Sequence, residues 1–267
     1  MAIDLTGKPI LITGASSGIG RETALHCARA GMPVVLAARR ADKLNDAVAQ
    51  ITREGGRAIA VPLDVDDPAA CTAAVERCID AFGSIYSVFA NAGYGFEAPV
   101  HETTDQMFRA IFETNFYGTI NTIRPALEPM KTARQGHILI CSSCLAKFAV
   151  PYYSAYSATK AAQNHIGRAM SIELRPHGIR TSTVHPIGTR TEFFETAAKN
   201  SHEGTMMSEH TPNSFMQSPS TVARAVVRCL RRPRPEVWTS LPVHLGMSIA
   251  TFTPRISDYL LRRMLKP

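Results

Sequence analysis

The chain has 267 residues, 45% hydrophobic and 19% charged, which is typical of a folded globular protein and excludes a disordered one. We find no apolar run of about 18 residues and no basic region followed by an apolar stretch in residues 1–8, so we expect a cytoplasmic protein without a membrane span or secretory signal. The net charge of +7 lies in residues 224–267, while residues 1–223 are neutral, and this uneven distribution argues against a nucleic-acid partner.

Short β-branched runs alternate with amphipathic stretches along the chain. The expected strands are 9–13, 33–37, 58–63, 85–90, 136–141, 179–185 and 237–239, and the expected helices are 18–30, 41–54, 67–82, 104–131, 153–175 and 220–232. This alternation predicts an α/β fold with a doubly wound parallel sheet, Rossmann-like, covered by helices on both faces. Residues 189–219 break the pattern and are expected to form a substrate-loop insertion. We predict one domain over 1–240, followed by a helical tail over 241–267.

A glycine-rich segment with the spacing G-x-x-x-G-x-G follows the first expected strand and opens the first expected helix. Glycines allow a tight turn and a close backbone approach to a pyrophosphate, and the helix N-terminus offers free N–H groups. The alternative is a structural glycine turn, which the position between strand and helix makes weak. We expect this segment to bind a dinucleotide through Gly14, Ser16, Ser17, Gly18, Ile19 and Gly20.

The end of the second expected strand indicates which dinucleotide binds. An NAD site usually has an acidic residue there, which accepts a hydrogen bond from the ribose 2′-OH. This chain instead has Arg39 and Arg40, and guanidinium groups suit a 2′-phosphate. The sequence therefore predicts NADP(H), with Arg39 as the first candidate. For Arg40, a position facing the solvent is the alternative.

Tyr156 and Lys160 are four residues apart in an expected helix, so their side chains share one face. A phenol has a pKa of about 10, and a nearby ammonium group stabilises the phenolate and lowers that pKa. The tuned phenol can exchange a proton with a carbonyl or hydroxyl oxygen. The alternative is an ordinary helix pair, because Y-x-x-x-K is common by chance.

Together these motifs, over about residues 7–192, resemble the short-chain dehydrogenase/reductase family. The resemblance implies that Ser143, thirteen residues before Tyr156, orients the substrate. Ser142 ranks lower because it alternates to the other face of its strand. The resemblance also implies that Asn115 holds a water that links Lys160 to solvent, and that Lys160 holds the nicotinamide ribose. The expected catalytic residues are Asn115, Ser143, Tyr156 and Lys160.

The same resemblance extends the cofactor site beyond the glycine-rich segment. It implies an adenine contact at Asp64 and Val65, and a segment flanking the adenosine ribose. After the sixth strand the family closes over the nicotinamide amide with P-G-x-x-x-T. Here Ile187 stands in place of that glycine, and Gly188 is the candidate for the turn. These predicted cofactor residues are Asp64, Val65, Asn91, Ala92, Gly93, Tyr156, Lys160, Pro186, Ile187, Thr189 and Thr191.

The resemblance implies hydride transfer between nicotinamide and a carbonyl or secondary alcohol, and reduction is the expected direction because cellular NADP is kept reduced. Apolar side chains in the insertion favour a hydrophobic substrate, with simple packing of the loop as an equal alternative; they are Phe193, Phe194, Met206, Met207, Phe215 and Met216. The rivals are an alcohol dehydrogenase and a non-catalytic dinucleotide sensor that binds a partner through its tail. Cys141 and Cys144 form C-x-x-C, but the histidines and cysteines lack metal-ligand spacing, so we expect no metal.

The tail over 241–267 departs from the family pattern. Apolar residues recur at Ile256, Leu260 and Met264, and Leu261 and Leu265 widen that face, whereas Arg262, Arg263 and Lys266 lie on another side. This spacing predicts a basic amphipathic helix. It suits an anionic membrane, an acidic partner, a second subunit or the chain's own domain. By resemblance, helices 104–131 and 153–175 are expected to join a homodimer or homotetramer.

Overall fold

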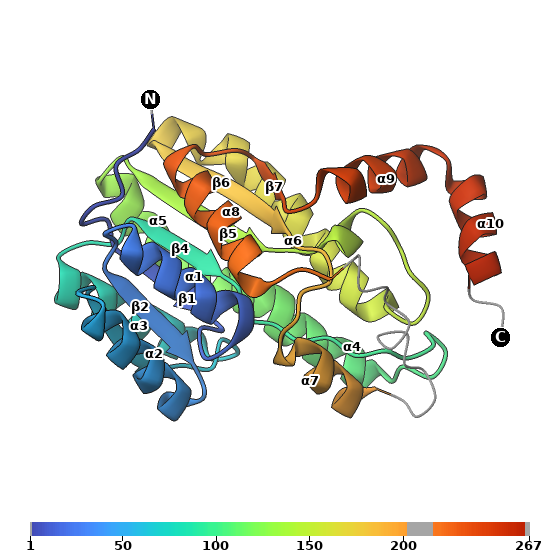
Figure 1. Ribbon diagram of the computed structural model, residues 1–267, viewed down its shortest axis with the longest axis horizontal. Helices are drawn as coiled ribbons and strands as arrows, with labels where there is room; N and C mark the ends of the chain where they lie inside the picture. The colour runs from blue at the N-terminus through green and yellow to red at the C-terminus, as the bar shows by residue number, and fades with distance from the viewer. Residues whose placement is uncertain (1, 202–215, 265–267) are drawn as a thin grey trace.

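Seven strands alternate with helices along the part of the chain that the structure describes, residues 2–201 and 216–264 (Figure 1). The structure is a computed structural model. In chain order its elements are β1 (Ile10–Thr13), α1 (Gly18–Arg29), β2 (Val34–Ala38), α2 (Ala41–Arg53), β3 (Ala58–Pro62), α3 (Pro68–Phe82), β4 (Ser87–Ala90), α4 (Asp105–Phe112), the π-helical turn η1 (Glu113–Tyr117), α5 (Gly118–Thr132), β5 (Gly136–Cys141), the 3-10 turn η2 (Cys144–Ala146), α6 (Ser154–Glu173), the 3-10 turn η3 (Arg175–His177), β6 (Ile179–His185), α7 (Glu192–Asn200), α8 (Pro219–Arg231), β7 (Glu236–Trp238), α9 (Leu241–Phe252) and α10 (Pro254–Met264).

The seven strands lie in one parallel sheet in the order β3-β2-β1-β4-β5-β6-β7. The chain first winds outward from β1 to β3, then crosses back to β4 and winds the other way. This reversal leaves a crevice between the loops that follow β1 and β4, at the carboxyl ends of the strands. The predicted doubly wound Rossmann-like fold is confirmed, with one sheet domain followed by C-terminal helices.

Alternation along the strands builds one hydrophobic core on each face of the sheet. In β1, Ile10 and Ile12 point towards the layer that contains α1, α2 and α8, whereas Leu11 points towards α3, α5 and α6. All three side chains are fully buried. Because both faces are covered, the strands carry nearly continuous apolar sequence rather than a polar outer face.

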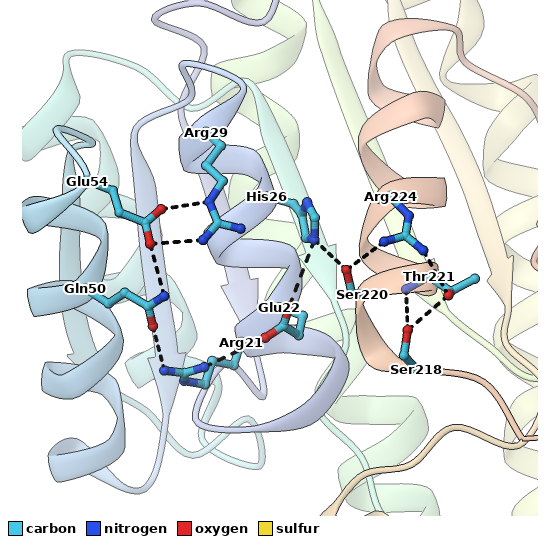
Figure 2. A network of polar contacts seen from close by, with 10 residues as sticks. All are labelled: Arg21, Glu22, His26, Arg29, Gln50, Glu54, Ser218, Ser220, Thr221 and Arg224. Atoms are coloured by element: carbon cyan, nitrogen blue, oxygen red, sulfur yellow. Dashed lines mark hydrogen bonds and ion pairs between the residues drawn. The ribbon is translucent and has the colours of Figure 1, made fainter.

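Polar side chains fasten α1 to the helices on either side of it (Figure 2). Towards α2, Arg29 donates two hydrogen bonds to the Glu54 carboxylate, at 2.7 and 3.0 Å. Towards α8, His26 Nε2 lies 2.8 Å from Ser220 Oγ. Hydrogen bonds from Arg29, and then from Gln50, lower the pKa of Glu54 to about 2. These contacts are largely exposed, so they orient α1 more than they stabilise the fold.

The expected long helical stretch over 104–131 is present from Asp105 to Thr132, but a π-helical turn that the sequence did not indicate divides it into α4 and α5. At this turn the N–H of Gly118 donates to the carbonyl of Glu113, five residues earlier. The carbonyl of Asn115 accepts hydrogen bonds from two side chains, from Thr119 Oγ1 at 2.7 Å and Gln163 Nε2 at 2.6 Å. Such turns are rare and occur mainly where a side chain must be re-aimed.

The insertion and the tail also contain structure that the sequence patterns left open. Within 189–219 the chain forms α7, and a backbone bridge between Thr189 and Gln217 closes its base; residues 202–215 are outside the described part. The tail forms two helices, α9 and α10, which meet at Pro254 and extend away from the sheet (Figure 1). Within the described ranges, no helix is both long and apolar enough to cross a membrane.

A buried histidine makes the stability of the fold depend on pH. His137 in β5 is fully buried, and its Nε2 lies 2.8 Å from the hydroxyl of Ser182. That hydroxyl donates to the carbonyl of Arg234 at 2.6 Å, so His137 Nε2 must donate to it. Burial, and then the charge of Arg180, lower the pKa of His137 to about 3. The folded protein therefore holds this side chain neutral.

We predict that the free energy of unfolding falls as the pH drops from about 6.5 towards 3. In this range the unfolded chain protonates His137 and the folded chain does not, so acid favours unfolding. One such proton gives a slope of roughly 1.4 kcal/mol per pH unit. His137→Gln should lower the slope near pH 5 by about that amount, measured by urea unfolding at several pH values. Equal slopes in the variant and the wild type would contradict this account.

Candidate active site

A cavity of about 640 Å³ opens at the carboxyl ends of the strands, beside the crevice between β1 and β4. This volume lies within the usual range of small-molecule and cofactor sites. The cavity brings together all the predicted cofactor residues except Gly20, and all the predicted catalytic residues except Asn115. The predicted residues that line it are Gly14, Ser16, Ser17, Gly18, Ile19, Arg39, Arg40, Asp64, Val65, Asn91, Ala92, Gly93, Ser143, Tyr156, Lys160, Pro186, Ile187, Thr189 and Thr191.

The glycine-rich loop forms a cradle that larger side chains would fill. Gly14 has a φ of +65°, which favours glycine, and a Cβ there would lie 2.9 Å from Asn91 Nδ2. A Cβ on Gly20 would collide with the carbonyl oxygen of Gly14. Asn91, after β4, donates from Nδ2 to the carbonyl of Thr13 at 3.0 Å and so holds the loop in place. The backbone therefore stays open towards the cavity, as the approach of a pyrophosphate requires.

Two arginines lie beside this loop, after β2. Arg40 Nη2 donates to the hydroxyls of Ser16 and Ser17, each at 3.0 Å, and also lies 2.8 Å from a carboxylate oxygen of Glu192 in α7. The Arg40 side chain is therefore partly exposed, but its guanidinium group binds the glycine-rich loop. It does not simply face the solvent, which was the alternative that the sequence left open. Arg39 lines the same end of the cavity and is exposed. The glycine cradle and the two guanidinium groups fit an anionic dinucleotide.

Tyr156, Ser143 and Lys160 meet on the other side of the cavity. Tyr156 and Lys160 are buried in α6, and Lys160 Nζ lies 5.5 Å from the centroid of the Tyr156 ring. Lys160 Nζ donates to the carbonyl of Cys141 at 2.8 Å. The Ser143 hydroxyl accepts from the N–H of Leu145 at 3.1 Å and lies beside the Tyr156 phenol, whose pKa it lowers.

The adjacent serines after β5 have different surroundings. Ser142 Oγ is buried and donates to the backbone carbonyl of Lys160 at 2.9 Å. Ser143 Oγ instead faces the cavity and Tyr156. The lower rank given to Ser142 therefore agrees with its position, which links β5 to α6.

The pKa of Tyr156 differs from the expectation. Burial raises the pKa of its phenol above the ordinary value, and the hydrogen bond with Ser143 acts in the opposite direction. Burial also lowers the pKa of Lys160. A low local dielectric disfavours the charged form of each group, the phenolate and the ammonium alike. In this structure Tyr156 is a neutral phenol, which can donate a proton.

Asn115 lies behind the cavity wall, in the π-helical turn. Its Oδ1 accepts from the N–H of Tyr94 at 2.9 Å, and its Nδ2 donates to the carbonyl of Tyr94 at 2.9 Å and to Thr159 Oγ1 at 3.1 Å. A Cβ on Gly93 would lie 2.8 Å from Asn115 Oδ1 and 3.7 Å from Lys160 Nζ. Only a residue without a side chain fits between the amide and the amine.

The segment after β6 accommodates Ile187 without strain. The carbonyl of Pro186 accepts from the N–H of Cys144, and Thr189 Oγ1 donates to the carbonyl of Ile187 at 2.8 Å. Neither Ile187 nor Gly188 is among the described residues with a positive φ. Thr191 caps α7 by accepting from Phe193 N–H. The backbone of this segment therefore needs no left-handed residue at Ile187 or Gly188, and the segment lines the cavity.

Apolar side chains form the part of the cavity near Tyr156. The Phe193 ring centroid lies 5.5 Å from that of Tyr156, and Phe194 also lines the wall. Of the other predicted apolar residues, Met206, Met207 and Phe215 are outside the described residues, and Met216 is not part of the lining. Sequence reasoning missed Val243 and Met247, which come from α9 in the tail. No sequence motif marks these two residues, because only the tertiary fold places the tail beside the cavity.

A buried carboxylate supports the same wall. Tyr153 lines the cavity and donates from its hydroxyl to Glu97 at 2.5 Å, and Glu97 is only 2% exposed. Burial, and then Glu97, raise the pKa of Tyr153. Tyr153 therefore stays protonated and holds the segment before α4 against the start of α6.

Three stacked rings join α9 to the domain. The His185 ring lies 4.5 Å from Trp238, and Trp238 lies 4.3 Å from His244 of α9, with the rings nearly parallel. His185 is buried, and burial lowers its pKa to about 4, so the neutral ring donates from Nδ1 to the carbonyl of Ser143 at 2.9 Å. The contact chain runs from the tail to the backbone of a predicted catalytic residue.

Comparisons with known proteins agree with this geometry. Residues 8–202 match the family model described as short chain dehydrogenase. An uncharacterised oxidoreductase of Listeria monocytogenes is 32% identical over 231 residues, which cover 86% of this chain and 92% of that protein.

Among solved structures, a short-chain dehydrogenase/reductase from Burkholderia phymatum in complex with NAD is 21% identical, with a TM-score of 0.87 and coverage of 96% of each chain. An alcohol dehydrogenase from Thermococcus sibiricus, complexed with 5-hydroxy-NADP, is 28% identical, with a TM-score of 0.75 and coverage of 86% of this chain and 95% of that one. The chain therefore belongs to the short-chain dehydrogenase/reductase family and is an oxidoreductase with an NAD(P)-binding Rossmann fold.

Proposed function

We propose that this chain is an NADP(H)-dependent enzyme that reduces the carbonyl group of a hydrophobic substrate. The observation that carries the proposal is the shape of one continuous cavity. Its basic end, with Arg39 and Arg40, suits a 2′-phosphate, and its apolar end contains Tyr156 and Ser143. Residues 1–240 would form the catalytic domain, with 241–267 as a tail.

The residues at the basic end would hold the dinucleotide. The cradle of Gly14, Gly18 and Gly20 and the N-terminus of α1 suit the pyrophosphate, with Ser16 and Ser17 beside it. The remaining predicted contacts come from Ile19, Asp64, Val65, Asn91, Ala92, Gly93, Pro186, Ile187, Thr189 and Thr191. When bound, the nicotinamide supplies or accepts a hydride. Arg39 and Arg40 match the charge of NADP(H), and the two structural neighbours named above contain either an NAD or an NADP ligand.

The residues at the apolar end would move the proton. The Ser143 hydroxyl orients the carbonyl oxygen, and Tyr156 donates its phenolic proton to that oxygen. Lys160, 5.5 Å from the ring, stabilises the phenolate that remains. By resemblance to the family, Asn115 would hold a water that links Lys160 to solvent and so returns the proton. The raised pKa of Tyr156 keeps the phenol protonated, which is the form that donates to a carbonyl oxygen.

The rival functions are less well supported. Alcohol oxidation uses the same residues but starts from the phenolate form of Tyr156, which burial disfavours. A non-catalytic sensor does not need Ser143 and Tyr156 to meet in the cavity. A homodimer or homotetramer formed through the helices over 104–131 and 153–175 remains our proposal for the assembly. The large exposed side chains of Tyr117 in η1 and Ile172 in α6 support it.

We predict that Tyr156→Phe lowers turnover by about a thousandfold, within the range of a lost general acid. The variant keeps the ring and its packing on Phe193, so coenzyme affinity should change less than twofold. Turnover is measured as NADPH consumption with a panel of aldehydes and ketones, and affinity by NADPH fluorescence. Retained turnover would exclude Tyr156 as the proton donor. NADPH binding without turnover of any carbonyl or alcohol by the wild type would favour the sensor.

We predict that Arg39→Gln weakens NADPH binding about tenfold or more and leaves NADH binding within twofold. The reason is that charge-assisted hydrogen bonds to the 2′-phosphate exist only with NADPH. Arg40→Gln should weaken both coenzymes, because Arg40 also braces Ser16 and Ser17. Arg77→Gln, at an exposed position of α3 away from the cavity, is the matched control for the loss of one arginine charge. Both affinities are measured by calorimetric titration, and tighter binding of NADH than NADPH by the wild type would refute the NADP(H) preference.

A further inference from the structure

The helix α9 exposes a stripe of large apolar side chains to solvent. Leu241, Leu245, Ile249 and Phe252 recur at helical spacing and are between 56% and 86% exposed. In α10, Ile256 continues the exposed apolar surface. Single exposed apolar residues are normal, but a contiguous set of this kind marks an interaction surface.

The opposite side of α9 is already used by the domain. Val243 and Met247 line the cavity, His244 stacks on Trp238, and Thr251 Oγ1 donates to the carbonyl of Lys147 at 3.1 Å. The helix is therefore held in place by one face while the other points outward, along the arm that leaves the sheet (Figure 1). The apolar stripe lies on the face of α9 that points away from these contacts with the domain.

Basic residues lie next to this stripe. No charged residue occurs from 237 to 254, and residues 255–267 then contain four basic residues and one acidic residue. Of these, Arg255, Arg262 and Arg263 are exposed on α10, and Arg263 covers the ring of the exposed Tyr259, at 5.7 Å from its centroid. An apolar helix next to exposed arginines and a tyrosine is typical of segments that lie on anionic membranes.

We propose that the arm formed by α9 and α10 binds the surface of an anionic lipid bilayer, with α9 lying in the plane of the membrane. Twelve residues of helix are about 18 Å long, short of the roughly 30 Å hydrocarbon core, so α9 lies on the bilayer and does not span it. The stripe from Leu241 to Phe252 enters the interface, and the arginines of α10 contact lipid phosphates.

Charge favours a membrane over a second copy of this chain as the occupant. Two copies meeting through their tails would bring like-charged α10 segments together, which is repulsive, whereas anionic lipid attracts them. The proposal goes beyond the catalytic function and does not depend on it. Because Val243 and Met247 belong to the same helix, it places the wall of the cavity at the bilayer surface.

Vesicle sedimentation tests the proposal with the full chain. We expect binding to vesicles of phosphatidylcholine with one-third phosphatidylglycerol, weak binding to phosphatidylcholine alone, and release at about 0.5 M salt. Arg262→Gln with Arg263→Gln should weaken binding about 30-fold, and Leu245→Ser with Ile249→Ser about tenfold or more. Unchanged circular dichroism and thermal midpoint identify variants that remain folded.

Matched controls separate these effects from general changes in charge or hydrophobicity. Arg231→Gln with Arg232→Gln removes the same charge at the end of α8, before the amino end of β7, whereas the tail follows the carboxyl end of that strand, and Val100→Ser removes an exposed apolar side chain from the segment before α4. Both controls should bind as the wild type does. Equal binding to neutral and anionic vesicles, or equal effects of controls and tail variants, would overturn the proposal. So would an oligomer that Leu245→Ser with Ile249→Ser dissociates while no vesicle binding occurs.

Discussion

A charged amine in a protein interior needs a partner, and Lys160 finds one at the end of β5. Its Nζ donates to the carbonyl of Cys141 at 2.8 Å, and Ser142 Oγ donates in return to the carbonyl of Lys160 at 2.9 Å. These two bonds fix the register of α6 against β5. One turn earlier on α6, Tyr156 then faces Ser143, the second residue after the strand. The arrangement of the whole apolar end of the cavity depends on this register.

The π-helical turn has a comparable role on the neighbouring element. It aims the Asn115 amide at the backbone of Tyr94 and brings Gly93 between that amide and Lys160. Within this turn the carbonyl of Asn115 accepts from the side chains of Thr119 in α5 and Gln163 in α6. Contacts with the neighbouring helix therefore anchor the irregular turn.

The two ends of the cavity differ in their physical character, and both depend on segments distant in sequence. At the basic end, Arg40 joins the glycine-rich loop to α7 through Glu192. At the apolar end, the stack of His185, Trp238 and His244 brings α9 over the site. One face of α9 therefore lines the cavity, and its opposite face exposes apolar side chains to solvent.

The sequence by itself determined the elements, the parallel doubly wound sheet and the position of the dinucleotide loop, because hydrophobic period and glycine spacing are local properties of the chain. It also identified Tyr156 and Lys160 as neighbours, since four residues make one helical turn. It missed the π-helical turn at Asn115, the raised pKa of the phenol and the contribution of Met247 to the cavity wall. Those depend on burial and on contacts between segments far apart in sequence, which only the packed tertiary structure decides.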